Sequence, residues 1–196
     1  MSRKDTETRQ REIIRATLEL LAESGTQNLT TAHIAERVGI SEAALYRHFD
    51  GKFDIIGSSI KFVGKRMKSE LSEMPEEKSP KEKLKRVFFH HLEYIEDHPG
   101  NARLLFSDDI HFDDPELRKL LRGIVEERKS FIRKIIEEGQ QQGAIKPGMD
   151  PEGVALMFIG LIQSKVLLWS LAGRRPALTH KSRKIWGVFE EAITNK

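Results

Sequence analysis

Eight residues between positions 31 and 52 carry side chains that suit contact with duplex DNA. Four of them can donate a hydrogen bond to a phosphate oxygen or pair with its charge, namely Thr31, Tyr46, His48 and Lys52. Arg47 can bind a phosphate or the edge of a guanine, and Glu42 can accept a hydrogen bond from a cytosine amino group. The small side chains of Ala43 and Ala44 allow close approach and contact with thymine methyl groups.

The same segment predicts two short helices joined by a tight turn. Gly39 separates an apolar-striped helix over 31–38 from a second helix over 41–47, and glycine tolerates the positive φ that such a turn needs. Ser41 is a typical N-cap, and Leu45 can anchor the second helix to the core. We therefore predict a helix-turn-helix whose second helix presents its exposed face to a major groove. The alternative is a surface helix pair within an all-helical domain, which has the same spacing.

The segment resembles the signature of the TetR (TetR/AcrR) family of bacterial transcriptional repressors. The residues that carry the resemblance, which covers about residues 8–68, are Thr30-Thr31, Ile34-Ala35, Val38-Gly39-Ile40-Ser41, Leu45-Tyr46-Arg47-His48-Phe49 and Lys52. The resemblance implies a three-helix DNA-binding head, a helical ligand-binding body and a homodimer formed by the last two long helices. Two positions depart from the pattern. Ala32 stands where some members have a basic side chain that reads DNA, and Ala43 stands where glycine is frequent.

Within this family, residues 30–32 and 41–49 are similar to the nucleoid-occlusion subgroup, and His98-Pro-Gly resembles a stretch of its body. That subgroup binds chromosomal sites and antagonises the division protein FtsZ. A nucleoid-occlusion inhibitor of cell division is therefore the alternative to a repressor released by a small molecule. The alternative is the weaker reading, because similarity in a DNA-binding head does not carry over the partner of the body.

The rest of the chain has helical periodicity and no alternating strand pattern. Helix starts are signalled by Ser79-Pro80, Asp114-Pro115 and Asp150-Pro151, since a capping side chain precedes a proline suited to the first turn. The expected helices cover about 8–24, 52–68, 80–97, 99–107, 115–142, 151–172 and 179 to the end. We predict an all-α fold with a DNA-binding domain over 1–50, extending to about 68 through a connecting helix, and a ligand-binding and dimerisation bundle over 69–196.

Charge and composition agree with a soluble DNA-binding protein. Residues 1–68 hold 12 Lys and Arg against 9 Asp and Glu, whereas the remainder holds 21 of each. The absence of cysteine excludes disulfides, thiolate zinc sites and a cysteine nucleophile. No signal peptide is recognised at the N-terminus, and the longest apolar stretch, 154–171, is interrupted by polar residues at 163–165. We expect a cytoplasmic, nucleoid-associated protein with no membrane partner.

The helix expected from Pro151 is apolar on every face, which predicts that one side packs on its own core and the other on a second copy of the chain. Such a dimer would place two recognition helices about 34 Å apart, matching a pseudo-palindromic operator. The candidate interface residues are Met157, Leu161, Leu168, Ile185, Val188 and Phe189.

The family resemblance also implies an effector pocket in the body, for a small molecule of unknown identity. Its candidate lining residues are Phe62, Phe88, His91, Phe106, Phe131, Phe158 and Trp169, for each of which core packing is the alternative. Few charged residues fall among the apolar positions of the body, so we expect a hydrophobic or amphipathic effector.

Metal and enzyme functions are not favoured. Histidines 90, 91 and 98 and the acidic stretch around Asp108, Asp109, His111, Asp113 and Asp114 lack the spacing of a ligand set, and a solvated loop before a helix cap explains the carboxylates. The chain contains no P-loop, dinucleotide-binding glycine pattern, nucleophile elbow or paired zinc histidines. We predict no catalytic residue, no metal and no cofactor.

Overall fold

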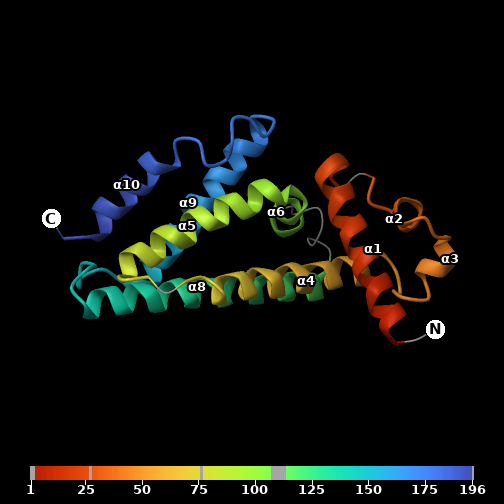
Figure 1. Ribbon diagram of the computed structural model, residues 1–196, viewed down its shortest axis with the longest axis horizontal. Helices are drawn as coiled ribbons and strands as arrows, with labels where there is room; N and C mark the ends of the chain where they lie inside the picture. Colours follow the sequence, from red (N-terminus) through yellow and green to blue (C-terminus); the bar gives the residue numbers. More distant parts are fainter. Residues whose placement is uncertain (1–2, 27, 76, 107–113, 196) are drawn as a thin grey trace. The chain divides into compact units, whose positions relative to one another are not determined.

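The computed structural model describes residues 3–26, 28–75, 77–106 and 114–195, and these residues contain helices and no strand (Figure 1). The helices are α1 (Arg3–Ser24), α2 (Thr31–Val38), α3 (Glu42–Leu45), α4 (Lys52–Ser72), α5 (Pro80–Asp97), α6 (Pro99–Phe106), α8 (Pro115–Gln141), α9 (Pro151–Leu171) and α10 (Ser182–Ile193). The predicted all-α fold is confirmed. The candidate metal residues Asp108, Asp109, His111 and Asp113 lie outside the described residues.

The predicted caps explain where the helices start. Ser79 Oγ accepts a hydrogen bond from the Glu82 N–H at 3.2 Å. Asp114 accepts from the N–H groups of residues 116 and 117, and Asp150 from those of residues 152 and 153. Each cap satisfies donors that the first turn of a helix leaves unpaired.

Helix α1 starts at Arg3 rather than near residue 8, and α4 ends at Ser72 rather than near residue 68. Two further boundaries differ from prediction for local reasons. Helix α3 is shorter than the expected 41–47, because the N–H groups of Arg47 and His48 bond to carbonyls three residues back, which tightens the chain into turns. Helix α10 starts at Ser182 rather than near 179, because Lys181 has a φ of 59° and cannot continue a right-handed helix.

The described chain separates into two compact units. Unit 1 comprises the described residues of 1–70 and 98–123, and unit 2 those of 71–97 and 124–196. The division of the chain into domains at about residue 69 stays a prediction, since unit 1 also includes α6 and the beginning of α8.

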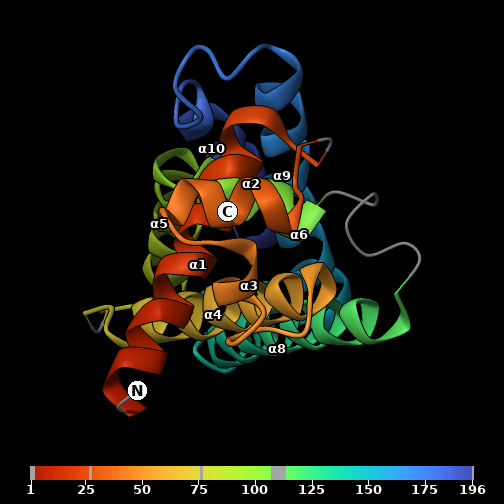
Figure 2. The same cartoon turned by 90° about the vertical axis from the view of Figure 1, so that its right-hand side faces the viewer.

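In unit 1, α1 packs against α2 on one side and against α6 on the other, and Figure 2 turns α1, α2 and α3 toward the viewer. A Cβ placed on Gly100 of α6 would lie 2.0 Å from the carbonyl oxygen of Leu18. The Arg103 guanidinium donates to the Leu21 carbonyl at 2.9 Å. Helix α6 therefore lies directly on the backbone of α1.

In unit 2, an aromatic cluster forms the core where α5, α9 and α10 meet. Its ring centroids lie 5.6 Å apart for Phe88 and Trp186, 6.1 Å for Phe88 and Phe158, and 5.7 Å for Phe158 and Phe189. The two pairs that include Phe158 are edge-to-face and the Phe88–Trp186 pair is tilted, and such aromatic contacts stabilise a core beyond simple burial.

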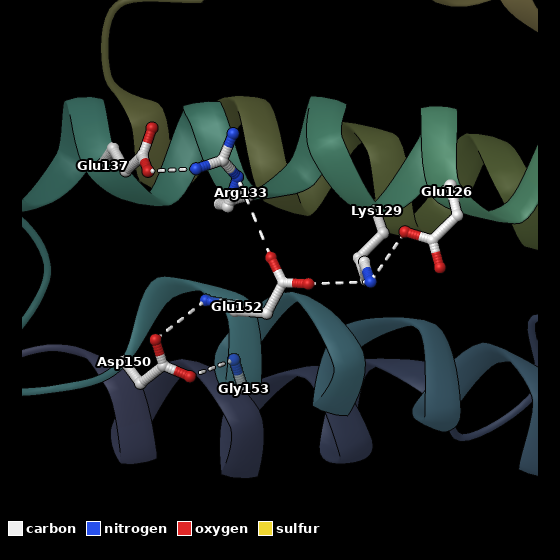
Figure 3. A network of polar contacts seen from close by, with 7 residues as sticks. All are labelled: Glu126, Lys129, Arg133, Glu137, Asp150, Glu152 and Gly153. Carbon is white, nitrogen blue, oxygen red and sulfur yellow. Dashed lines mark hydrogen bonds and ion pairs between the residues drawn. The ribbon is translucent and has the colours of Figure 1, made fainter.

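Charged side chains connect α8 to the start of α9 (Figure 3). Glu152 lies 2.7 Å from Lys129 Nζ and 3.9 Å from Arg133 Nε, and Lys129 also pairs with Glu126 at 2.8 Å. Hydrogen bonds to Glu126 and then to Glu152 raise the pKa of Lys129. The groups face solvent, so these pairs contribute little net stability and mainly set how the two helices align.

Candidate DNA interface and sites in the body

The helix-turn-helix has the geometry that its sequence predicts. Gly39 adopts φ 76° and ψ 35°, and its N–H bonds to the carbonyls of Ala35 and Glu36 to end α2. Ser41 Oγ accepts from the Ala44 N–H at 3.2 Å to begin α3. Leu45 is fully buried and fixes α3 against the core.

The eight candidate DNA-contact residues and Ala32, which stands at a DNA-reading position of the family and is the ninth candidate, are all exposed or half-buried. The exposed ones are Ala32, Glu42, Ala43, Tyr46 and Arg47, and the half-buried ones are Thr31, Ala44, His48 and Lys52. Tyr46 is 51% exposed although it is aromatic and follows the buried Leu45. This side of the motif therefore presents donors and small side chains to solvent while its opposite side packs.

Two of the nine residues bond to each other. Thr31 Oγ1 donates to Glu42 Oε1 at 2.5 Å, across the turn between α2 and α3. In this conformation the Thr31 hydroxyl hydrogen is committed to Glu42 rather than available for a phosphate. The second carboxylate oxygen of Glu42 can still accept a hydrogen bond from a base.

An ion-pair cluster that the sequence analysis did not single out fixes α2 to α1. Arg37 pairs with Glu23 at 2.6 Å and with Glu19 at 3.7 Å. The hydrogen bond to Glu23 raises the pKa of Arg37, and the same bond lowers the pKa of Glu23. The residues are 14 and 18 positions apart, so no helical spacing in the sequence could reveal the cluster.

The seven pocket candidates do not come together in one unit. Phe62 and Phe106 belong to unit 1 and are 36% and 40% exposed. Phe88 and Phe158 are fully buried in the aromatic core of unit 2, which is the alternative that the sequence left open for them. His91 is buried, and Phe131 and Trp169 are half-buried.

Phe131 lines a cavity of about 400 Å³ in unit 2, between the beginning of α5 and the middle of α8. Its lining is mixed. Leu71, Pro80 and Val87 are apolar, and Lys83, Arg86 and Glu138 bring charge. The cavity is large enough for a small ligand.

Apolar side chains on one side of α9 and α10 are exposed in the single chain. Their exposed fractions are 63% for Leu156, 50% for Met157, 60% for Leu167, 65% for Leu168, 75% for Leu171 and 72% for Val188. We call these six residues the α9–α10 face. Of the predicted interface residues, Leu161 and Ile185 are half-buried beside it. Phe189 does not belong to this face, although the sequence predicts it at the subunit interface. Its ring is only 3% exposed and packs on Phe158 and Trp186.

By length and composition alone, α9 could also cross a membrane, a test that the core helices of soluble proteins pass as well. One side of α9 is buried in unit 2 through Val154, Phe158 and Ile162. Lys165 donates to the His180 carbonyl at 2.9 Å and so joins α9 to the segment before α10. These contacts are those of a helix packed in a folded domain.

Unit 2 also contains a contact between the half-buried Arg128 of α8 and the buried His91 of α5. Arg128 Nη2 bonds to His91 Nδ1, and burial lowers the pKa of Arg128 to about 10. Burial, reinforced by the charges of Arg128 and His90, lowers the pKa of His91 well below its ordinary value. His91 is thus held neutral.

Among the described residues, no group of three or more His, Asp or Glu could hold a metal ion.

The depressed pKa of His91 predicts lower stability in acid. The unfolded chain binds a proton below about pH 6.5 that the folded chain does not bind, so stability is lost as the pH falls below that value. We expect the His91→Gln variant, which retains an acceptor for Arg128, to lose about 1 kcal/mol less than the wild type between about pH 7.5 and about pH 5.5. Thermal unfolding at the two pH values measures this difference. Equal losses in both proteins would contradict it.

A helix-turn-helix whose second helix has an exposed side, in a chain with a further helical unit, is typical of a DNA-binding regulator. Residues 13–57 match the family model described as bacterial regulatory proteins, tetR family, and residues 80–185 match the tetracyclin repressor-like C-terminal domain. The chain belongs to the tetR family of transcriptional regulators, as the resemblance of its helix-turn-helix predicts.

Its relatives include regulators with different roles. It is 29% identical over 160 residues to the nucleoid occlusion factor SlmA of Vibrio cholerae, covering 81% of this chain and 82% of the relative. It is 27% identical over 187 residues to the fatty acid metabolism regulator protein of Bacillus subtilis, covering 94% and 95%.

The fold resembles that of solved regulators. The structure of FadR from Bacillus subtilis in complex with stearoyl-CoA has a TM-score of 0.72 at 26% identity, covering 91% of this chain and 96% of that one. FadR from Bacillus halodurans has a TM-score of 0.81 at 20% identity, covering 92% and 94%, which supports the fold alone.

Proposed function

We propose that the protein is a dimeric transcriptional repressor that binds a pseudo-palindromic operator and is released from it by a hydrophobic or amphipathic small molecule. The exposed reading residues on a correctly capped helix-turn-helix carry this proposal. An acyl-CoA is the first effector to test, because the similar Bacillus subtilis regulator was solved with stearoyl-CoA. Release requires that the effector bind more tightly to the conformation with low operator affinity.

In this proposal residues 1–50 read DNA, α4 connects them to the body, and residues 69–196 bind the effector and the second subunit. The contacts to DNA come from Thr31, Ala32, Glu42, Ala43, Ala44, Tyr46, Arg47, His48 and Lys52. The protein works in the cytoplasm at the nucleoid, without catalysing a reaction and without a cofactor. The operator is read at two half-sites because the dimer has twofold symmetry.

Recovery of genomic DNA fragments on the purified protein, followed by sequencing, tests the proposal. At about physiological salt, non-specific binding is weak and specific sites dominate. We expect one or a few palindromic sites beside promoters, and the neighbouring genes would point to the effector. Lack of enrichment would overturn the proposal.

Tyr46 and Lys52 provide the sharpest test of the interface. We expect Tyr46→Ala or Lys52→Ala to weaken operator binding by about 10- to 100-fold, because each removes a contact to a charged phosphate at both half-sites. Lys52→Ala should also lower the number of phosphates that the dimer neutralises by about two, which reduces the slope of log affinity against log salt concentration. Fluorescence anisotropy at several salt concentrations measures both effects.

The matched control is Lys134→Ala, an exposed lysine of α8, which should change neither quantity. Size-exclusion chromatography should show the same oligomeric state for all variants. Unchanged operator affinity in Tyr46→Ala and Lys52→Ala would remove both residues from the interface.

A second candidate is nucleoid occlusion, which the similarity to SlmA favours. It predicts many sites scattered over the chromosome and direct binding of the DNA-bound protein to FtsZ. Absence of such binding at saturating DNA would eliminate this candidate.

A further inference from the structure

Among the lysine and arginine side chains in the described part of unit 2, Arg128 alone has a buried nitrogen without a hydrogen-bond partner. Its Nη2 bonds to His91 Nδ1, and its Nε is buried without a hydrogen-bond partner. A guanidinium has five donors and is rarely buried without an acceptor for them. The Nε donor of Arg128 therefore has no acceptor in the protein.

Arg128 also lacks the carboxylate that other arginines have. Arg37 pairs with Glu23, and Arg133 pairs with Glu137, whereas no described carboxylate lies within ion-pair distance of Arg128. The neighbouring carboxylate of Glu126 on α8 pairs with Lys129 instead. A charge that is partly withdrawn from water without an opposite charge costs free energy, which an anion bound beside it would recover.

His91 has the protonation state that an anion site would use. Since Nδ1 accepts from Arg128, the proton of the neutral ring lies on Nε2, which is a donor. The pair therefore offers donors from both side chains and only one acceptor, which is already occupied. A ligand that satisfies these donors must therefore carry acceptors, which a second cation or a neutral group with few acceptors would not supply.

Apolar side chains flank the pair, and Tyr94 and His90 of α5 also lie close enough to affect the pKa values of Arg128 and His91, respectively. One turn from His91 on α5 lie the buried side chains of Phe88 and Ile95, and one turn from Arg128 on α8 lies the buried Ile132. An anion that reaches this position must therefore bring an apolar portion that tolerates these neighbours.

We propose that Arg128 and His91 bind the anionic group of an amphipathic effector, a carboxylate or a phosphate, while its apolar portion lies among the neighbouring side chains. This inference rests on the proposed function and deepens it. Arg128 recognises the anion, and His91 positions the guanidinium. The class of effector is thus an anionic amphiphile rather than a neutral lipid.

Three probes of the same chain length test this, namely oleate, oleoyl-CoA and oleyl alcohol. Binding is followed through the fluorescence of the two tryptophans, and operator release by anisotropy. We expect at least one anionic probe to bind the wild type about tenfold or more tighter than the alcohol. Preference for oleate would identify a carboxylate at Arg128, and preference for oleoyl-CoA a phosphate.

The Arg128→Met variant should lose this preference and bind all three probes alike. Its melting temperature without ligand should equal or exceed that of the wild type, because a half-buried charge without an opposite charge has been removed. Arg128→Gln, which retains donors without charge, should behave in the same way and serves if the methionine variant does not fold.

Failure of this inference differs from failure of the proposed function. Equal binding of alcohol and anions by the wild type, or an unchanged preference in the Arg128 variants, would overturn the anion site while leaving release by a neutral effector possible. Charge-dependent binding that does not release the operator would support the anion site and contradict the proposed function. Absence of binding by every probe would overturn the anion site.

Discussion

Replacing Gly100 with alanine is expected to destabilise unit 1 by about 3 kcal/mol, because the added methyl group has no room. Its Cβ would lie 2.0 Å from the Leu18 carbonyl oxygen and 2.8 Å from the carbonyl carbon, both of which are backbone atoms of α1. A backbone carbonyl within a helix cannot rotate away as a flexible side chain can. The two helices must therefore separate, and the Arg103 bond to the Leu21 carbonyl would stretch with them.

Gly123→Ala is the matched control. Gly123 also lies in a helix, and nothing lies within 4 Å of its Cβ position. Alanine there should stabilise the helix by up to about 1 kcal/mol. Thermal unfolding measures both variants, and we expect Gly100→Ala to melt about 10 °C below the wild type. A melting temperature within a degree or two of the wild type would show that α1 and α6 do not approach this closely.

The close approach at Gly100 illustrates what the sequence could not predict. The contact joins Gly100 to Leu18, which is far away in the chain, and a glycine after His98-Pro99 equally suits an ordinary helix start. Arg128 is a similar case. It stands in a run of charged residues at 126–129 that is typical of a solvated surface, and only the packing of α5 on α8 buries its Nε.

The helix-turn-helix and the helix starts could be predicted because their causes are local. Gly39, Ser41 and Asp150 act on backbone groups within four residues, so their types and spacing are sufficient. The hydrogen bond between Thr31 and Glu42 was not predicted, because it depends on the angle between two helices.

Helix α10 shows the limit of periodicity. Val188 and Phe189 are adjacent apolar residues, and both were predicted to face a second subunit. The structure buries Phe189 in the aromatic core and leaves Val188 72% exposed. When both sides of a helix are apolar, the pattern predicts that both sides are buried. It does not tell which residues face the core of the same chain and which face a partner.

Replacing Leu168 with glutamate is expected to weaken dimerisation by at least about 100-fold. Leu168 is 65% exposed on the α9–α10 face, together with Leu167, Leu171 and Val188. An apolar surface of this kind is typical of a subunit interface. In a twofold dimer the substitution occurs twice, and each leucine contributes about 2 kcal/mol when buried. Analytical ultracentrifugation over a range of concentrations measures the change.

Loss of the dimer should also weaken operator binding. A monomer contacts one half-site with one recognition helix, whereas a dimer binds both half-sites together. Val125→Glu is the matched control, since Val125 is an apolar residue of α8 that is 42% exposed and lies outside the α9–α10 face. It should leave both the dimer and the operator affinity unchanged. An unaltered dimer in Leu168→Glu would place the interface elsewhere. A stable monomer that still binds the operator as tightly as the wild type would show that reading DNA does not require the second subunit.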